Sequence, residues 1–160
     1  LFRKQVIRGD VHDPGAAMLG GVCGHAGLFS TSEDIAIIFQ MYLQNGYYGG
    51  IQFFDTATIN EFTSYQHDGI ENRRALGFDK PFKKYDEYGP VCKSASTSSF
   101  GHSGFTGTYV WADPEEELVY VFLSNRVYPR SDNYKISQYD IRTNIHQAIY
   151  NAINNRNFEK

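Results

Sequence analysis

The sequence predicts an α+β fold in which antiparallel strands pack against helices. Two runs of β-branched and aromatic residues, 108–112 and 118–123, flank a short acidic segment with a proline, which suits a tight turn. Apolar residues at helical spacing mark one helix before this hairpin, at 35–42, and another after it, at 141–154. A hairpin between two amphipathic helices gives each element an apolar face to bury.

The first part of the chain is expected to contain two helices. Glycines throughout 8–27 keep any regular element there short. Two candidate capping boxes within 30–34 predict a helix at 31–44. A second helix is predicted at 56–65, beginning at Asp55 or Thr56.

Between the second helix and the hairpin the periodicity is lost. The apolar patch 75–78 is a candidate strand, and the small polar residues of 93–99 predict a loop. The hairpin itself is predicted at 107–112 and 118–124. Its second strand is apolar at every position, so both of its faces should be covered, as in the middle of a sheet. A final helix is predicted at 140–154.

Composition narrows the classes of function. The chain has 160 residues, a net charge of -3 and 41% hydrophobic residues, which fits one globular domain rather than a disordered or fibrous chain. With this negative net charge, the chain has no excess of basic residues that would bind the phosphate backbone of a nucleic acid. No apolar run approaches the roughly 18 residues that cross a membrane. The chain shows no signal peptide and begins without Met, so we expect it to be a piece of a longer protein.

Neither a metal site nor a cofactor is predicted. Asp10, His12 and Asp13 lie close in sequence, but no zinc-type spacing completes them. Two cysteines, Cys23 and Cys92, are too few for a disulfide scaffold. Small buried thiols are the favoured interpretation, and a single bridge between them stays open if the protein is exported.

The most informative stretch is 100–108, FGHSGFTGT, where small and hydroxylated residues and a histidine precede a buried strand. One interpretation is the nucleophile elbow G-x-S-x-G of α/β-hydrolases, but Phe105 stands where the last glycine belongs and a strand follows instead of a helix. A second interpretation is structural, with glycines that let a strand enter the sheet and with His102 and Ser103 merely hydrogen-bonded. A third is a family resemblance.

The segments FGHSGFTGTYVWADP and LVYVFLSNRVYP resemble the third motif and the closing strands of serine β-lactamase-like hydrolases. That family includes class C β-lactamases, D-alanyl-D-alanine carboxypeptidases, D-aminopeptidases and esterases. Upstream, GGVCGHAGLFSTSEDIA resembles the segment that leads into a helix after the family's second motif. The match looks closest to the β-lactamase-like domain appended to family 3 glycoside hydrolases, the β-N-acetylglucosaminidases.

The resemblance implies the C-terminal part of a β-lactamase/transpeptidase-like sandwich. An antiparallel sheet would carry the C-terminal helix on it, with helices of the helical lobe beside the cleft. In the family, strands and a helix from the N-terminal part complete the same sheet, so that missing part is the expected partner of this chain. Without it an apolar face or sheet edge stays open, and we expect a homo-oligomer or crystal packing through that surface.

The resemblance also implies roles for single residues. The backbone N–H of Phe105 would stabilise the oxyanion formed during acyl transfer. His102 would take the place of the lysine found in other members. Ser103 would offer a hydroxyl to the substrate, and Gly104 would keep the wall free of a side chain. His25 would lie near the cleft, in a binding role or in a structural hydrogen bond.

Two motifs of the family are absent from the sequence. No lysine completes Ser-x-x-Lys, and no tyrosine begins Tyr-x-Asn. Ser131-Asp132-Asn133 spells the second motif of class A enzymes, but it follows the third motif and is interpreted as a surface turn. We therefore expect residues 1–160 to form a single incomplete domain, with the nucleophile outside the chain and no activity alone.

Two charged features of the sequence are interpreted as parts of the protein surface. The acidic run 115–117 is expected to be solvated in a turn. Arg126 closes the second strand of the hairpin, where it is expected either to reach a carboxylate or to pair at the surface.

Three functions remain open from the sequence. In the first, the parent is an exported, periplasmic or cell-envelope serine hydrolase of amide or ester bonds that acts on a small-molecule or peptidoglycan-derived substrate. In the second, the domain is non-catalytic and binds peptidoglycan fragments or supports an attached glycosidase. In the third, the chain is a complete small hydrolase that uses Ser103, which requires an acid or base within hydrogen-bonding reach of its hydroxyl.

Overall fold

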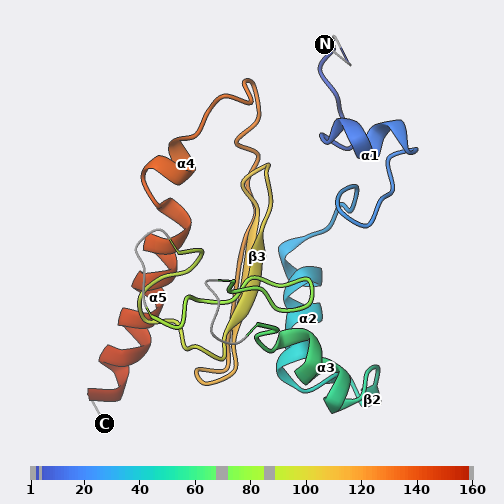
Figure 1. The fold of residues 1–160 in the computed structure, drawn as a ribbon. Coiled ribbons are helices and arrows are strands. Elements are labelled where there is room, and N and C mark those ends of the chain that lie inside the picture. The colour runs from blue at the N-terminus through green and yellow to red at the C-terminus, as the bar shows by residue number, and fades with distance from the viewer. Residues whose placement is uncertain (1–2, 4, 68–71, 85–88, 159–160) are drawn as a thin grey trace. The chain divides into compact units, whose positions relative to one another are not determined.

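The protein is described by a computed structural model that covers residues 3, 5–67, 72–84 and 89–158. The chain divides into two compact units, residues 1–31 and residues 32–160. The second unit contains the sheet and the helices that pack on it (Figure 1).

The first unit contains one short helix, α1, Pro14–Met18. Asp13 caps it, because its Oδ1 accepts a hydrogen bond from the Ala16 N–H at 2.7 Å, and proline suits the first helical position. A helix of 5 residues agrees with the prediction that the glycine-rich stretch holds only short elements. Several large apolar side chains of this unit are exposed: Val6, Met18, Leu19, Val22, Leu28 and Phe29.

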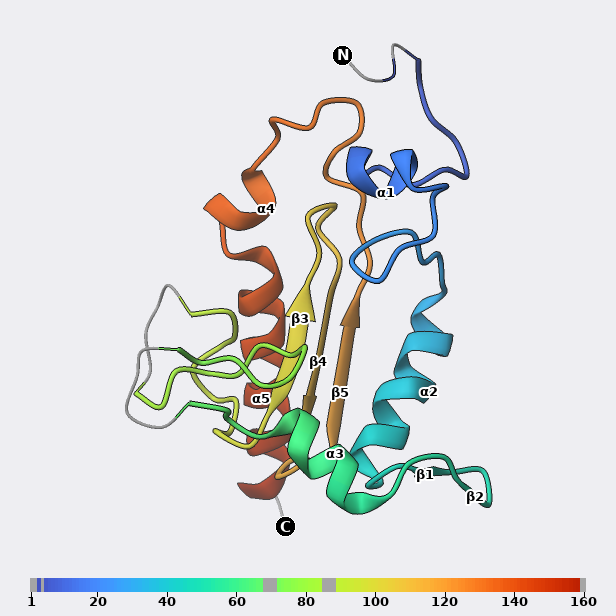
Figure 2. The same ribbon diagram turned by 45° about the vertical axis from the view of Figure 1, so that its right-hand side comes forward.

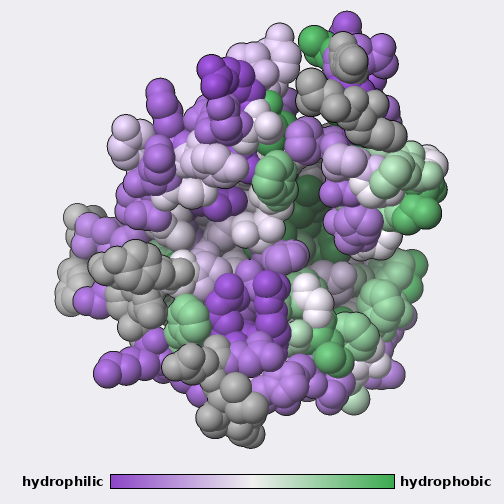
Figure 3. Space-filling model, turned by 45° about the horizontal axis from the view of Figure 1, so that its top comes forward, coloured by the Kyte–Doolittle hydropathy of each residue, from purple (hydrophilic) through white to green (hydrophobic). Residues whose placement is uncertain are grey.

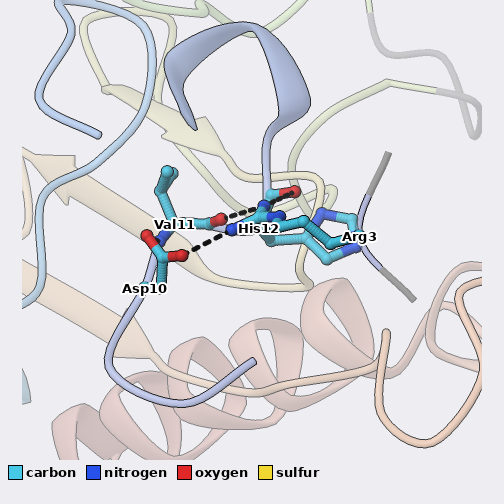
Figure 4. Close-up of polar contacts among 4 residues, drawn as sticks. All are labelled: Arg3, Asp10, Val11 and His12. Carbon is cyan, nitrogen blue, oxygen red and sulfur yellow. Dashed lines mark hydrogen bonds and ion pairs between the residues drawn. The ribbon is translucent and has the colours of Figure 1, made fainter. Parts of the chain in front are cut away.

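An arginine ties the start of the first unit to the segment before α1 (Figure 4). Nη1 of Arg3 pairs with Oδ2 of Asp10 at 2.7 Å. Nη2 of Arg3 donates to the carbonyl oxygens of Val11 at 2.5 Å and His12 at 3.2 Å. One guanidinium thereby contacts three consecutive residues.

The second unit is built around three antiparallel strands in sequence order. β3, Phe100–Ser103, pairs with β4, Tyr109–Asp113, which pairs with β5, Leu118–Phe122. The predicted hairpin is confirmed, and Trp111 stands opposite Tyr120 in its register.

The prediction that both faces of the second hairpin strand are covered is confirmed, although among the described residues β4 is the central strand and β5 pairs with β4 alone. The reason is that helices lie on both faces of the sheet. Four of the five side chains of β5 are half-buried and Tyr120 is buried. An edge strand between two helical layers therefore has the apolar run typical of a central strand.

Helix α2, Ser32–Leu43, covers one face of the sheet (Figure 2). Its Phe39 packs with Phe100 of β3 and Ala112 of β4 in a buried cluster, and the two phenylalanine rings stack with centroids 6.2 Å apart. The helix predicted at 31–44 is thus confirmed to within one residue at each end.

Helix α5, Ile141–Phe158, covers the opposite face. Its Tyr150 joins Trp111 and Tyr120 in the second buried cluster, because successive side chains of a strand point to opposite faces. The helix predicted at 140–154 is confirmed, and it continues to Phe158. The unit is therefore a helix–sheet–helix sandwich, in agreement with the predicted α+β class.

A buried carboxylate links this sandwich to the loop predicted at 93–99. Asp113 accepts hydrogen bonds from the Tyr150 hydroxyl at 2.5 Å, from the Ser96 N–H at 2.9 Å and from the Ser96 hydroxyl at 2.6 Å. Burial and the neighbouring carboxylate raise the pKa of Tyr150 above its usual value. The polar loop is thus anchored in the core by its serines.

The apolar patch 75–78 forms a turn and not the predicted strand. The Ala75 N–H donates to the Phe78 carbonyl at 3.0 Å, and Gly77 has a φ of 85°, which favours glycine. The patch is apolar because Ala75 is buried and Phe78 packs on the α2 cluster. Backbone pairing here is limited to isolated bridges.

The remaining elements are short. The predicted helix at 56–65 is confirmed as α3, Thr56–Thr63, with Asp55 as its N-cap. The sequence did not indicate three others: β1, Tyr47–Tyr48, its partner β2, Ile51–Gln52, and α4, Lys135–Gln138.

On the face seen in Figure 3, hydrophobic side chains gather in one part of the visible surface, and hydrophilic side chains predominate over the rest of it. Exposed apolar side chains of the second unit include a group from the β1–β2 hairpin and α3: Tyr47, Ile51, Phe53, Phe54 and Phe62. In the part of the chain that the structure describes, no helix has the length and hydropathy to span a membrane.

Candidate active site

Strand β3 carries the His-Ser-Gly sequence at one edge of the sheet. Gly101 stands opposite Trp111, and a Cβ on Gly101 would lie 2.2 Å from the Val110 carbonyl oxygen and 2.4 Å from the indole ring. Glycine is therefore required for β3 to lie this close to β4. His102 and Ser103 follow and complete the strand.

The outer edge of β3 is covered only in part. Asp79 and Gly101 exchange two backbone hydrogen bonds, of 2.7 Å and 3.1 Å. Because outward-facing peptide groups alternate along an antiparallel strand, those of Ser103 face the same side as those of Gly101. No strand among the described residues pairs with Ser103 on that side.

His102 faces a buried carboxylate that also contacts two arginines. Its Nδ1 lies 3.5 Å from Oδ2 of Asp79, whose side chain is only 5% exposed. Arg73 and Arg74 both form ion pairs with Oδ1 of the same carboxylate, that of Arg73 at 2.9 Å. Burial alone would raise the pKa of Asp79, but its contacts with His102, Arg73 and Arg74 outweigh burial and hold that pKa below its usual value.

A polar cavity of about 190 Å³ opens beside the end of β3. Ser103 and Tyr109 contribute from the strands, and Asp140, Arg142 and Thr143 contribute from the start of α5. The wall is completed by Gly89, Pro90, Ile136 and Ser137.

The guanidinium of Arg142 is the cation of this cavity. It is half-buried, its Nη1 lies 3.4 Å from the Thr108 carbonyl oxygen, and its Cζ lies 5.8 Å from the centroid of the Tyr109 ring. No carboxylate of the described residues forms an ion pair with it. Burial lowers the pKa of Arg142 from its ordinary value, although a guanidinium stays protonated at neutral pH. Such a group is suited to an anionic ligand.

The loop after β3 is a tight turn. The Gly104 N–H donates to the Thr108 carbonyl at 2.9 Å, and the Gly107 N–H donates to the Gly104 carbonyl at 3.0 Å. A Cβ on Gly104 would lie 2.3 Å from Oγ1 of Thr108, so a larger residue at this position would displace the Thr108 hydroxyl. Phe105 is 61% exposed.

Comparison with known proteins decides which family has this arrangement. Residues 3–142 match the family described as Beta-lactamase. The chain belongs to the beta-lactamase family.

Two relatives with curated names are each called "Putative D-alanyl-D-alanine carboxypeptidase". The chain is 34% identical over 137 residues to the protein from Salmonella agona (strain SL483), and 34% identical over 139 residues to that from Salmonella enteritidis PT4 (strain P125109). Each match covers 85% of this chain and 31% of the relative. The chain therefore spans about a third of the length of these relatives.

Among solved structures, a beta-lactamase from Mycobacterium bovis aligns with a TM-score of 0.59 and 22% identity, over 78% of this chain and 44% of that one. This likeness confirms the predicted beta-lactamase-like fold.

The structure brings four of the predicted site residues of this family together. His102, Ser103, Gly104 and Phe105 lie consecutively on β3 and the loop after it. His25 belongs to the first unit, where its Nε2 lies 3.0 Å from Oδ1 of the residue that caps α1. The roles implied by the resemblance remain predictions for all five.

The acidic cluster before α1 is engaged within its own unit. Asp10 pairs with Arg3, and Asp13 caps α1 and contacts His25. No group of three or more His, Cys, Asp or Glu side chains suited to a metal ion occurs in the residues that the structure describes.

Three other predictions have an outcome. Residues 115–117 and 131–133 both lie exposed in turns, as predicted. The prediction for Arg126 is wrong: its side chain forms no ion pair with a carboxylate of the described residues, but donates to three carbonyl oxygens. Its position beside two loops brings it to the carbonyl oxygens of Phe105, Ser131 and Asn133.

Two residues of the site, Asp79 and Arg142, carried no signal in the sequence. Asp79 follows a turn that resembles a short strand, and its ion pairs depend on backbone pairing with Gly101, 22 positions later. Arg142 opens an apolar helical stripe, where a charged residue is ordinarily solvated. Only the tertiary packing of α5 on the sheet brings it to Ser103.

Proposed function

We propose that the chain forms one wall of the active site of a serine hydrolase that cleaves amide or ester bonds, with peptides that end in D-alanine as the substrate class. The junction of an open strand edge at Ser103 with the cavity that contains Arg142 is the observation that carries this proposal. A strand edge binds extended peptide backbone, and a half-buried guanidinium binds carboxylate. A carboxypeptidase substrate offers both groups, a peptide bond and a terminal carboxylate.

The residues of β3 and its loop would act on the reacting carbonyl. When a serine oxygen attacks the carbonyl carbon, the carbonyl oxygen gains negative charge, and the Phe105 N–H would stabilise it. The amine or alcohol then leaves with a proton, and water later releases the acyl group. The Ser103 hydroxyl would form a hydrogen bond with the substrate at the end of the strand. His102 would supply the polar side chain that lysine supplies in other members of the family.

The nucleophile would come from the rest of the polypeptide. No Ser-x-x-Lys occurs in the sequence. The Ser103 hydroxyl forms no hydrogen bond with an acid or base among the described residues, so the requirement for Ser103 as a nucleophile is not met. The chain alone would then form no acyl-enzyme.

Labelling with two acylating or phosphonylating probes tests this proposal. A fluorescent penicillin carries a carboxylate, whereas a fluorophosphonate does not. We expect both to label the full-length product of the gene and neither to label residues 1–160 alone. Labelling of the short chain would overturn the proposal. If neither protein is labelled, the non-catalytic domain that binds peptidoglycan fragments or supports a glycosidase is favoured.

A substitution separates the role of the cavity from that of the nucleophile. In the full-length protein, Arg142→Met should slow penicillin labelling roughly tenfold or more, because a charged hydrogen bond is lost. Labelling by the fluorophosphonate should stay unchanged. Arg130→Met is the matched control, because Arg130 pairs with Asp132 on the surface, and it should alter neither rate.

We further infer three properties from the resemblance to the family. The parent protein would lie in the periplasm or cell envelope, it would be fused to a family 3 glycoside hydrolase, and the short chain would self-associate through its open sheet. Fractionation of the source cells, the sequence of the gene and ultracentrifugation of the chain test these in turn. A cytoplasmic, unfused protein and a monomeric chain would contradict them.

A further inference from the structure

Arg126 holds two separate loops with one side chain. Its Nε donates to the Phe105 carbonyl at 2.7 Å, and its Nη1 donates to the carbonyls of Ser131 and Asn133, each at 2.9 Å. The guanidinium also lies over two aromatic rings, with Cζ 4.3 Å from the centroid of Phe105 and 4.8 Å from that of Tyr134. All of these partners belong to the two loops.

The same residue fixes the backbone of the loop after β3. The Gly104 carbonyl accepts from the Gly107 N–H at 3.0 Å. The next two carbonyls are both bound by Arg126, that of Phe105 by the side chain and that of Thr106 by the Arg126 N–H at 2.9 Å. Three successive peptide oxygens therefore have fixed partners.

This pattern determines where the Phe105 N–H points. A peptide unit is planar and trans, so the N–H of Phe105 is directed opposite to the C=O of Gly104. The Gly104 carbonyl points into the turn toward Gly107, and the N–H of Phe105 therefore points away from the turn. The Arg126 contact fixes the following peptide plane, which removes the second rotation about the Phe105 Cα.

We propose that Arg126 is a positioning residue that holds the Phe105 N–H in the orientation needed to bind an oxyanion. The structural half of this proposal concerns the loop alone, while its catalytic half rests on the proposed function. Arg126 contacts neither the reacting atoms nor the substrate in this assignment. It acts through the backbone of residues 104–106.

The second loop connects this position to the cavity. Residues 131–134, which Arg126 binds through Ser131 and Asn133, lead directly into α4. Ile136 and Ser137 of α4 line the cavity beside Ser103. One guanidinium thus fixes the distance between the wall that would bind a substrate carboxylate and the N–H that would bind the oxyanion.

Lysine cannot reproduce this arrangement. A single ammonium group lacks the planar fork that donates from Nε and Nη1 to different loops, and it stacks less well between two rings. Arg126→Lys keeps the charge and the aliphatic stem, so it should fold while losing the bridge. Arg130→Lys is the matched control, because the side chain of Arg130 pairs with exposed Asp132 and lies outside the bridge between the two loops.

NMR relaxation on the 160-residue chain tests the structural half. In the unsubstituted chain the backbone amides of Phe105 and Thr106 should have order parameters of about 0.85. In Arg126→Lys the order parameters of the same two amides should fall below about 0.6. Amides of β4 and β5 should keep their values in both proteins, which also verifies folding. Unchanged order at Phe105 and Thr106 would overturn the proposal, whatever the function of the protein.

Probe labelling of the full-length protein tests the catalytic half. Arg126→Lys should lower the limiting labelling rate at saturating penicillin roughly tenfold, because a misplaced oxyanion donor stabilises the transition state less well. The penicillin concentration that gives half of this limiting rate should stay within about twofold of its value in the unsubstituted protein. A raised half-saturation with an unchanged limiting rate would overturn the positioning role. Absence of labelling in the unsubstituted protein would instead count against the proposed function, and the NMR result would still decide the structural half.

Discussion

Nδ1 of His102 lies 3.5 Å from Oδ2 of Asp79, on a carboxylate that also pairs with Arg73 and Arg74. In the part of the chain that the structure describes, Asp79 is thus the carboxylate that His102, Arg73 and Arg74 share at the edge of β3. Its side chain is 5% exposed, and the guanidinium of Arg73, whose side chain is 24% exposed, is poorly compensated by water when Asp79 is removed.

Asp79→Asn should therefore lower the free energy of unfolding by about 3 kcal/mol, the scale for breaking a buried ion pair. Urea denaturation followed by circular dichroism measures this change. Asp132→Asn serves as the control, because the exposed pair Arg130–Asp132 should leave the unfolding midpoint where it was. Equal effects of the two substitutions would show that the Asp79 cluster does not stabilise the fold.

His146 should make stability depend on pH. It is 1% exposed, its Nε2 has no hydrogen-bond partner in the structure, and burial lowers its pKa to about 4. The unfolded state binds a proton at higher pH than the folded state does. The contribution of His146 to the free energy of unfolding is therefore fully present above the unfolded-state pKa of about 6.5, and it decreases as the pH drops toward about 4.

The contribution of His146 over that window is on the order of 3 kcal/mol. We expect His146→Gln to flatten the decline of unfolding free energy between about pH 6.5 and about pH 4, and the exposed His67→Gln control to leave it in place. Parallel declines in all three proteins would exclude His146 as the cause.

Gly101→Ala should disrupt the sheet. The new Cβ would meet the Val110 carbonyl oxygen at 2.2 Å and the Trp111 ring at 2.4 Å, and neither can move without separating β3 from β4. We expect a loss on the order of 3 kcal/mol in unfolding free energy. Thermal unfolding of Gly24→Ala, where a Cβ meets nothing within 4 Å, provides the comparison and should match the unsubstituted chain.

The two cysteines should differ in reactivity. Both are free thiols, Cys92 is buried, and burial raises the pKa of its thiol to about 11. Since the thiolate is the reactive form, Cys92 should react with a disulfide reagent at about pH 8 only after urea is added. Cys23, which is partly exposed, should react at once. In Cys23→Ser the fast phase should vanish, and a remaining fast phase would contradict the assignment.

Local patterns predicted the elements whose stability is local. The apolar stripe of α5 and the run of β-branched and aromatic residues in β4 each appear in a single stretch of sequence, and both elements are present in the structure. The same holds for the helix that Asp55 caps. The strand predicted from the short apolar run at 75–78 is wrong. Phe78 packs against α2, which explains why it is apolar, and Gly77 turns the backbone there.

Long-range contacts explain what could not be predicted in the site. The motif on β3 was found because its residues are consecutive. Asp79, Arg126 and Arg142 each reach it from another element, through a backbone bridge, a loop and a helix start. No spacing rule links such positions, since their separation depends on how the elements pack.

The acidic turn between β4 and β5 has a consequence for handling the protein. Glu115, Glu116 and Glu117 are exposed and directly precede β5, whose second edge has no partner strand among the described residues. Negative charge beside such an edge acts as a gatekeeper against amyloid-like stacking of copies. Replacing these three glutamates by glutamines removes that charge, so light scattering from the chain should rise in the substituted protein.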